Sequence, residues 1–340
     1  MSDRLTRVSS PAAIEDDLAA LWRDAARDAP IARALMANLV VYRDCPAADE
    51  VDLSAPLEGV PIDEVIERHP SRLIRLHHGG RPDPGAPVGA TISVLLFDTA
   101  GARFGVEEIA VRSSCADASL PSIVRRLALG DIPTSIWWTE DLSHSTPLEA
   151  LVTMGRQLLY DSRRWADLRR GFLALAALAA HPHGPDLADL NWRRLTPLRQ
   201  ALAHAVVAIG APLDALDPRA LGLRVRHGRN ERALAWLLAG WFCARLGWTA
   251  NDEWPVTIEE QPDGEAILTV SLGAGAITAT MTAQHVLVDY NGRVAPFSMA
   301  VPHESEAEAV AAELRSLTYD SGLRDALAAL AARLTSSGSL

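Results

Sequence analysis

Short apolar runs that end in polar or acidic residues alternate with amphipathic segments along the first half of the chain. Runs of this kind are typical of buried parallel strands, and the segments between them carry the spacing of helices. Strands separated by helices predict an α/β layer with a largely parallel sheet. The expected strands are 38–44, 72–76, 132–138 and 156–162, and helical spacing occurs within 11–35, 62–68, 119–129, 147–155 and 165–180.

Two further runs, 91–98 and 103–113, predict an antiparallel hairpin added to this sheet. A break at 181–190 precedes a helix for which Thr196 is the expected N-cap. We therefore expect residues 1–207 to form an N-terminal α/β domain with a mostly parallel mixed sheet, ending in a linker helix.

The second half of the chain changes to period-two alternation, which is typical of half-buried strands. Residues 208–340 are expected to form a C-terminal α+β domain, an antiparallel sheet with helices on one face, after a linker at 208–219. The expected strands are 221–228, 256–261, 265–273, 276–283 and 285–294, and the expected helices are 231–246, 306–317 and 323–334.

Adjacent tryptophans, Trp137 and Trp138, close one predicted parallel strand. Neighbouring residues of a strand point to opposite faces, so the second ring needs a second core layer or a partner. We expect Trp138, Asp161 and Arg72 to form an edge that carries the functional surface, because sites of α/β proteins concentrate at carboxyl ends of strands. The alternative is that the ring fills the core and that Asp161 pairs with Arg72.

Composition narrows the class of protein. A net charge of −11 argues against nucleic acid as a partner. No apolar run is long enough for a membrane helix, and the N-terminus lacks the apolar segment of a signal peptide, so we expect a cytoplasmic protein that does not bind membranes. All 32 residues of the Lys+Arg total are arginine, which excludes a P-loop lysine and Schiff-base chemistry.

Candidate chemistry is sparse. Cys45, Cys115 and Cys243 fit neither a disulfide framework nor a CxxC metal site, and we predict no catalytic residue, no metal and no cofactor. The segment Gly273-Ala-Gly275 predicts a hairpin turn, because no helix follows it to hold a pyrophosphate. Arginine pairs at 125–126, 163–164, 169–170 and 193–194 leave three interpretations open: a solvated face, an acidic partner surface, or a small phosphorylated metabolite.

Four motifs in one order resemble the glucose-6-phosphate dehydrogenase assembly protein family, OpcA. They are HPSRLIRL near 70, SLPSIVRRLALGDIPTSIWW at 119–138, LLYDSRRW near 160 and DLNWRRLTPLRQALA near 190. The resemblance spans about 35–205, and LAWLLAGWFCARLGW is similar to the family's C-terminal domain. Arg125 and Arg126 depart from it, because an apolar segment is expected before the double tryptophan.

The resemblance implies a non-enzymatic cytoplasmic protein that binds glucose-6-phosphate dehydrogenase and promotes its assembly or allosteric activation. Such a protein acts by binding one state of the enzyme better than another. The candidate partner-binding residues are Arg72, Trp137, Trp138, Asp161, Arg163, Arg164, Trp192 and Arg194, although Trp192 also suits packing against the preceding domain. Two alternatives remain: a metabolite-sensing module that binds a sugar phosphate or nucleotide, and a lysine-independent sugar-phosphate enzyme.

Overall fold

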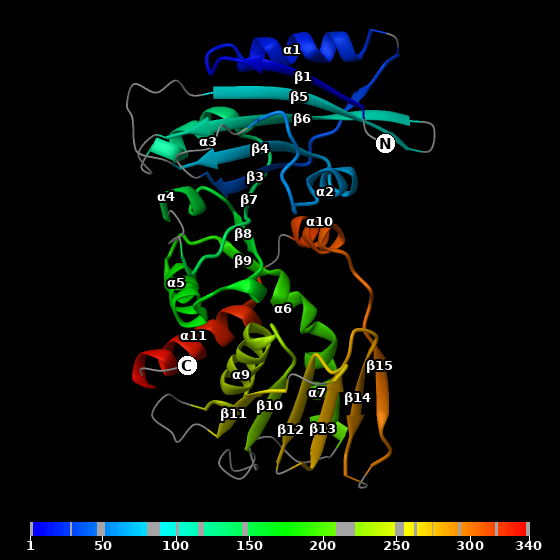
Figure 1. Ribbon diagram of the computed structural model, residues 1–340, viewed down its shortest axis with the longest axis vertical. Helices are drawn as coiled ribbons and strands as arrows, with labels where there is room; N and C mark the ends of the chain where they lie inside the picture. Colours follow the sequence, from blue (N-terminus) through cyan, green and yellow to red (C-terminus); the bar gives the residue numbers. More distant parts are fainter. Residues whose placement is uncertain are drawn as a thin grey trace.

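The computed structural model shows an elongated molecule in which two β-sheets lie at opposite ends (Figure 1). Its largest sheet occupies the N-terminal part, and a smaller sheet closes the other end. The structure describes residues 3–27, 29–45, 52–79, 89–99, 102–114, 119–144, 149–208, 222–248, 255–261, 264–273, 275–291, 294–316 and 319–337.

The large sheet has the order β1-β5-β6-β4-β3-β7-β8-β9, with β2 paired to β6. The six strands from β6 to β9 along this order are parallel, whereas β5 is antiparallel to both β6 and β1. The mostly parallel sheet and its hairpin are therefore confirmed. The strands are β1 Asp3–Ser9, β2 Ala32–Arg33, β3 Ala37–Asp44, β4 Ser71–His78, β5 Gly89–Thr99, β6 Ala102–Ser113, β7 Thr134–Trp138, β8 Gln157–Tyr160 and β9 Asp186–Asp189.

Helices cover both faces of this sheet, each through its apolar stripe. Four of them pack on one face: α1 (Ile14–Ala25), α3 (Leu120–Leu127), α4 (Glu149–Val152) and α5 (Leu168–Ala180). The other face is covered by α2 (Ile62–Arg68) and by α10 (Glu306–Ser316), which comes from the far end of the chain (Figure 1).

The smaller sheet has the order β11-β10-β12-β13-β14-β15 and is antiparallel except for the parallel pair β10–β11. Its strands alternate buried and accessible side chains, as the period-two pattern predicts. Helices α7 (Thr196–Ala208) and α9 (Arg232–Leu246) pack on it. The strands are β10 Leu223–His227, β11 Val256–Glu260, β12 Leu268–Leu272, β13 Ile277–Met281, β14 His285–Asp289 and β15 Phe297–Ala300.

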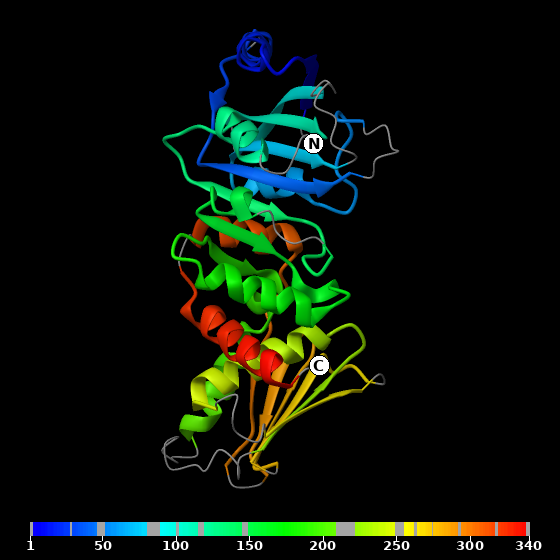
Figure 2. The same ribbon diagram turned by 90° about the vertical axis from the view of Figure 1, so that its left-hand side faces the viewer.

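The last two helices do not lie where the sequence predicts them. We expected them on one face of the second sheet, yet α10 packs against α2, and α11 (Ser321–Ser337) packs against α9 and α5. Figure 2 shows α11 and α9 between the two sheets. The chain thus returns to the large sheet after completing the small one, and the division at residue 207 remains a prediction. Among the described helices, none has the length and apolar character to cross a membrane.

Candidate functional site at the carboxyl edge of the large sheet

The two adjacent tryptophans fill two different cores. Trp137 is 2% exposed and packs in the cluster beneath α2 and α10, whereas Trp138 is 1% exposed and packs on the opposite face. The Trp138 ring stacks on Tyr42, with centroids 4.0 Å apart and planes 9° from parallel. The second core layer that the sequence required is therefore present, and neither ring is accessible to a partner in this conformation.

Arg72 does not share an edge with Trp138 and Asp161, so the predicted placement is wrong. It pairs with Asn38 at the amino end of the parallel strands, whereas Trp138 pairs with Tyr42 at the carboxyl end. Arg72 is fully buried and forms ion pairs with Glu15 of α1 and Glu107 of β6. The predicted pairing with Asp161 is also wrong, because Glu15 and Glu107 provide the partners.

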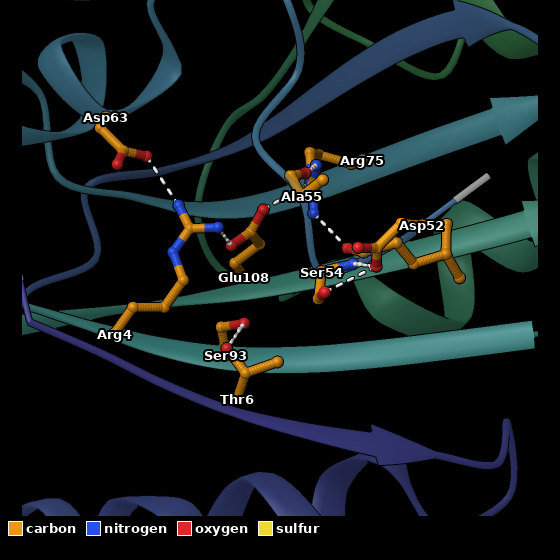
Figure 3. A network of polar contacts seen from close by, with 10 residues as sticks. Arg4, Thr6, Asp52, Ser54, Ala55, Asp63, Arg75, Ser93 and Glu108 are labelled. Carbon is orange, nitrogen blue, oxygen red and sulfur yellow. Dashed lines mark hydrogen bonds and ion pairs between the residues drawn. The ribbon is translucent and has the colours of Figure 1, made fainter.

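A matching network lies on the other face of the sheet, three residues along β4 (Figure 3). The Arg75 guanidinium contacts Glu108 at 2.5 Å, and Arg4 of β1 reaches Glu108 at 3.1 Å and Asp63 of α2 at 2.8 Å. The pKa of Glu108 is raised overall, because the effect of burial is larger than the lowering by the positive charges of Arg75 and Arg4. The two networks tie α1 and α2 to the sheet and connect its outer strand β1 to β6, which is a structural role.

The carboxyl ends of β8 and β9 open into a cleft of about 690 Å³ between the large sheet and the small one. Asp161, Arg163 and Arg194, three of the predicted partner-binding residues, line it. The opposite wall comes from the small sheet and from the segment that leads to α10. This cleft is the candidate functional site, because it is concave and carries charged side chains at the carboxyl edge.

One buried acid outside the cleft lining holds two of the arginines that line it. Glu231, which precedes α9, contacts Arg163 at 2.6 Å and Arg194 at 3.3 Å. Arg194 also donates to Asn191 Oδ1 at 2.9 Å. Beside them, Arg193 forms ion pairs with Glu304 at 2.8 Å and Glu313 at 2.9 Å. The arginine pair 193–194 therefore holds the two halves together and is not a free solvated face.

Asp161 and Arg164 remain accessible at the mouth of this edge. The Asp161 carboxylate accepts a hydrogen bond from the backbone of Arg163 at 2.9 Å, which fixes the short 3-10 turn Ser162–Arg164 after β8. The pKa of Glu306, opposite this turn, is raised by burial and by Asp161 and lowered by Arg164. Four predicted site residues thus meet in one place: Asp161, Arg163, Arg164 and Arg194.

Trp192 packs within the chain. Its ring lies 3.7 Å from the Arg199 guanidinium, and its Nε1 donates to Asp320 Oδ2 at 2.7 Å. Trp192 is 3% exposed and so packs inside the protein, but these two partners lie later in the chain and not, as the sequence analysis expected, in the preceding domain. It belongs to a separate short helix, α6 (Leu190–Arg194), which Asp189 caps by accepting from Asn191 N at 2.8 Å. The helix predicted from Thr196 onward is present as α7 (Thr196–Ala208), and Thr196 Oγ1 accepts from the Arg199 side chain.

Asp189 is the most perturbed acid of this edge. Burial, with help from the charge of Asp161, raises its pKa to about 7, although Ser162 and Asn191 donate hydrogen bonds to it. Its Oδ2 has no hydrogen-bond partner within the described residues. The neighbouring Tyr160 has its pKa raised by burial and by Asp189. The sequence analysis did not identify Asp189 as a site residue, although an aspartate before Leu-Asn-Trp at 190–192 is typical of the N-cap of a helix.

The parallel strands follow the order of doubly wound sheets that hold a dinucleotide. The residues present do not fit such a cofactor. Residues 45–61 separate β3 from α2 and contain one glycine, Gly59, so the glycine-rich turn that lets a backbone approach a pyrophosphate is missing.

Within the described chain, no group of three His, Cys, Asp or Glu residues is placed to hold a metal. Cys115, one of the three cysteines, lies outside the described residues.

Comparison with known families matches both halves of the chain. The family described as the glucose-6-phosphate dehydrogenase subunit N-terminal domain matches residues 62–177, and the one described as its C-terminal domain matches residues 185–327. The chain therefore belongs to the glucose-6-phosphate dehydrogenase assembly protein family, OpcA.

Curated relatives agree with this membership. An OxPP cycle protein OpcA from Synechocystis sp. is 26% identical over 62% of this chain and 43% of its own length. Another from Nostoc punctiforme is 25% identical over 55% of this chain and 40% of its own length. The chain thus aligns with less than half of the length of these relatives.

Among solved structures, a biliverdin reductase from Synechocystis sp. matches 88% of this chain and 98% of its own, with 12% identity and a TM-score of 0.43. An oxidoreductase from Magnetospirillum magnetotacticum matches the same shares at 13% identity and a TM-score of 0.38. A likeness at this level says nothing about activity.

Proposed function

We propose that this chain is a non-catalytic partner of glucose-6-phosphate dehydrogenase in the oxidative pentose phosphate pathway, and that it acts in the cytoplasm. The observation that carries the proposal is the match of both its halves to the family named for that enzyme. The curated relatives, named as OxPP cycle proteins, support the pathway.

The contact surface we propose is the accessible part of the carboxyl edge, Asp161, Arg163, Arg164 and Arg194. Its arginines come from a short turn and from α6 (Leu190–Arg194), which rigid elements hold in place. Arginine forks suit carboxylates of a partner because they form paired hydrogen bonds. The buried candidates, Arg72, Trp137, Trp138 and Trp192, would act through the shape of this surface and not by direct contact.

Binding alone provides the effect on the enzyme. A partner that favours the assembled or active state by a factor of ~100 shifts that equilibrium by roughly 2.7 kcal/mol. An interface with one or two desolvated arginine–carboxylate pairs at its centre is sufficient for such a difference.

The decisive experiment mixes the purified chain with glucose-6-phosphate dehydrogenase and measures the enzyme's sedimentation and its kcat/KM. We expect a complex and altered kinetics, with no turnover of glucose 6-phosphate or its lactone by the chain alone. Unchanged sedimentation and kinetics at saturating chain would refute the proposal.

The surface is tested by Arg164→Glu, with Arg224→Glu as the matched control. Both side chains are exposed and neither has an ion pair within the described residues, but Arg224 lies on β10, away from the cleft lining. We expect only the Arg164 variant to weaken the complex, by about tenfold or more, or ~1.4 kcal/mol. Equal affinities for the two variants would remove this surface from the proposal.

A further inference from the structure

Arg163 lines a second cavity of about 510 Å³ besides the cleft. One wall is the turn Ser162–Arg164 that follows the carboxyl end of β8. The other wall is the segment His227–Ala233, which connects the carboxyl end of β10 to α9. The cavity therefore lies where the carboxyl ends of strands from both sheets meet, the usual place for ligands in α/β proteins.

The cavity concentrates positive charge in an acidic protein. Among the described residues, its lining contains four arginines and one acid, Glu260. Arg163 is neutralised by Glu231, but the remaining three arginines, Arg164, Arg229 and Arg232, form no ion pair with the described part of the chain. Because arginines from two separate segments outnumber the acid in this lining, the cavity carries a net positive charge that attracts an anion.

The backbone adds to this field. Helix α9 points its N-terminus at the cavity, since Arg232 and Ala233 of its first turn line it. That first turn has no acidic residue, and the helix has no side-chain cap. Glu231, at the cap position, gives its carboxylate to Arg163 and Arg194 instead. A helix N-terminus without a cap presents free N–H groups and a partial positive charge to an anion.

We propose that this cavity is a binding site for a phosphorylated small molecule, whose phosphoryl group is held by Arg164, Arg229 and Arg232 at the start of α9. The arginine forks match phosphate oxygens in pairs, and the volume fits a ligand of sugar-phosphate or nucleotide size. The site goes beyond the proposed partner function, because the ligand binds to the chain alone.

The position of the site links it to the contact surface. Arg163 lines both this cavity and the cleft, and Glu231 bridges Arg163 to Arg194. An anion in the cavity competes with Glu231 for Arg163, so ligand binding alters the charge balance of the neighbouring cleft. Phosphorylated ligand and enzyme partner are thereby coupled, and each changes the affinity of the other by the same factor.

Isothermal titration calorimetry of the full chain tests the site, with inorganic phosphate, pyrophosphate, ATP and glucose 6-phosphate as separate probes at low ionic strength. We expect pyrophosphate to bind more tightly than phosphate, and the two organic probes distinguish a nucleotide from a sugar phosphate. Added salt weakens binding, since the contact is ionic.

The test variant is Arg229→Gln/Arg232→Gln, and the control is Arg125→Gln/Arg126→Gln on α3. All four side chains are exposed, so neither double variant removes a buried contact. We expect the first variant to lose at least about tenfold in affinity, ~1.4 kcal/mol, and the control to keep the affinity of the unmodified chain.

Three outcomes would overturn the site: no heat with any phosphorylated probe, equal affinities in the two double variants, or binding of an acidic peptide such as tetraglutamate but of no phosphorylated probe. Circular dichroism of each variant establishes that the fold is kept. The dehydrogenase is absent from this experiment, so the outcome is separate from that of the partner proposal.

Discussion

Replacement of Trp138 by alanine is the sharpest test of how the carboxyl edge is built. The ring is 1% exposed, stacks on Tyr42 at 4.0 Å and belongs to the main core, so the variant leaves a cavity with little room to collapse. Tryptophan-to-alanine changes at such sites cost ~3–5 kcal/mol. That is a large fraction of the ~5–15 kcal/mol that stabilises a typical folded domain.

Urea denaturation of the Trp138→Ala variant, followed by far-UV circular dichroism, measures this loss as a lower midpoint with an unchanged slope. Trp138→Phe is the control, because it keeps an aromatic ring against Tyr42, and it should lose much less. If Trp138→Ala unfolds at the midpoint of the unmodified chain yet binds the dehydrogenase at least ~2 kcal/mol more weakly, the ring is an interface residue and the argument from burial is wrong.

Three further results are expected. The folded state keeps the proton of Asp189, whose pKa is about 7, at pH values where the unfolded chain has lost it. Stability therefore falls as the pH rises from ~4 to ~7, by up to about 1.4 kcal/mol per unit, and Asp189→Asn should flatten this slope in denaturation at several pH values. Arg75→Met should cost ~3–5 kcal/mol by leaving Glu108 buried without its close partner, and adding Glu108→Leu should recover most of it in the same assay. Thr196→Ala should cost less than about 0.5 kcal/mol and Asp189→Ala about 1 kcal/mol, because Asp189 caps α6 through a backbone N–H whereas Thr196 Oγ1 accepts from the Arg199 side chain; equal melting temperatures for these two variants would contradict that difference.

Most of the fold could be predicted because its strands carry clear periodicities. The helix at 62–68 and the hairpin of β5 and β6 occur where the apolar spacing places them. The sequence did not predict strand β9, because it lies in the polar segment 181–190 and two of its four residues are aspartates. It forms through pairing with β8. The sequence could not predict that α10 packs against α2, because an apolar stripe shows that a helix is amphipathic but not which sheet it covers.

The candidate site could be predicted only in part. The rule that sites lie at the carboxyl ends of strands correctly places Asp161 at the edge. The rule does not predict burial, and Trp137 and Trp138 are buried and so absent from the surface. Arg72 was misplaced because its strand was correctly assigned to the same sheet, but Arg72 lies at the amino end of that strand and not at the carboxyl end. The signal for a structural role was the adjacent acid pair Glu107–Glu108 in β6, which presents one carboxylate to each face of the sheet.

The return of α10 to the large sheet has a consequence for biosynthesis. A ribosome releases β3, β4 and β7 well before residues 306–316, so one face of the large sheet, including Leu73 and Trp137, lacks its α10 cover until that helix has been synthesised. Domains usually complete themselves from the N-terminus as they are made. In this chain the apolar residues beneath α10 stay exposed in the nascent protein until Glu306–Ser316 is made, and exposed apolar surface of this kind is prone to aggregation during synthesis.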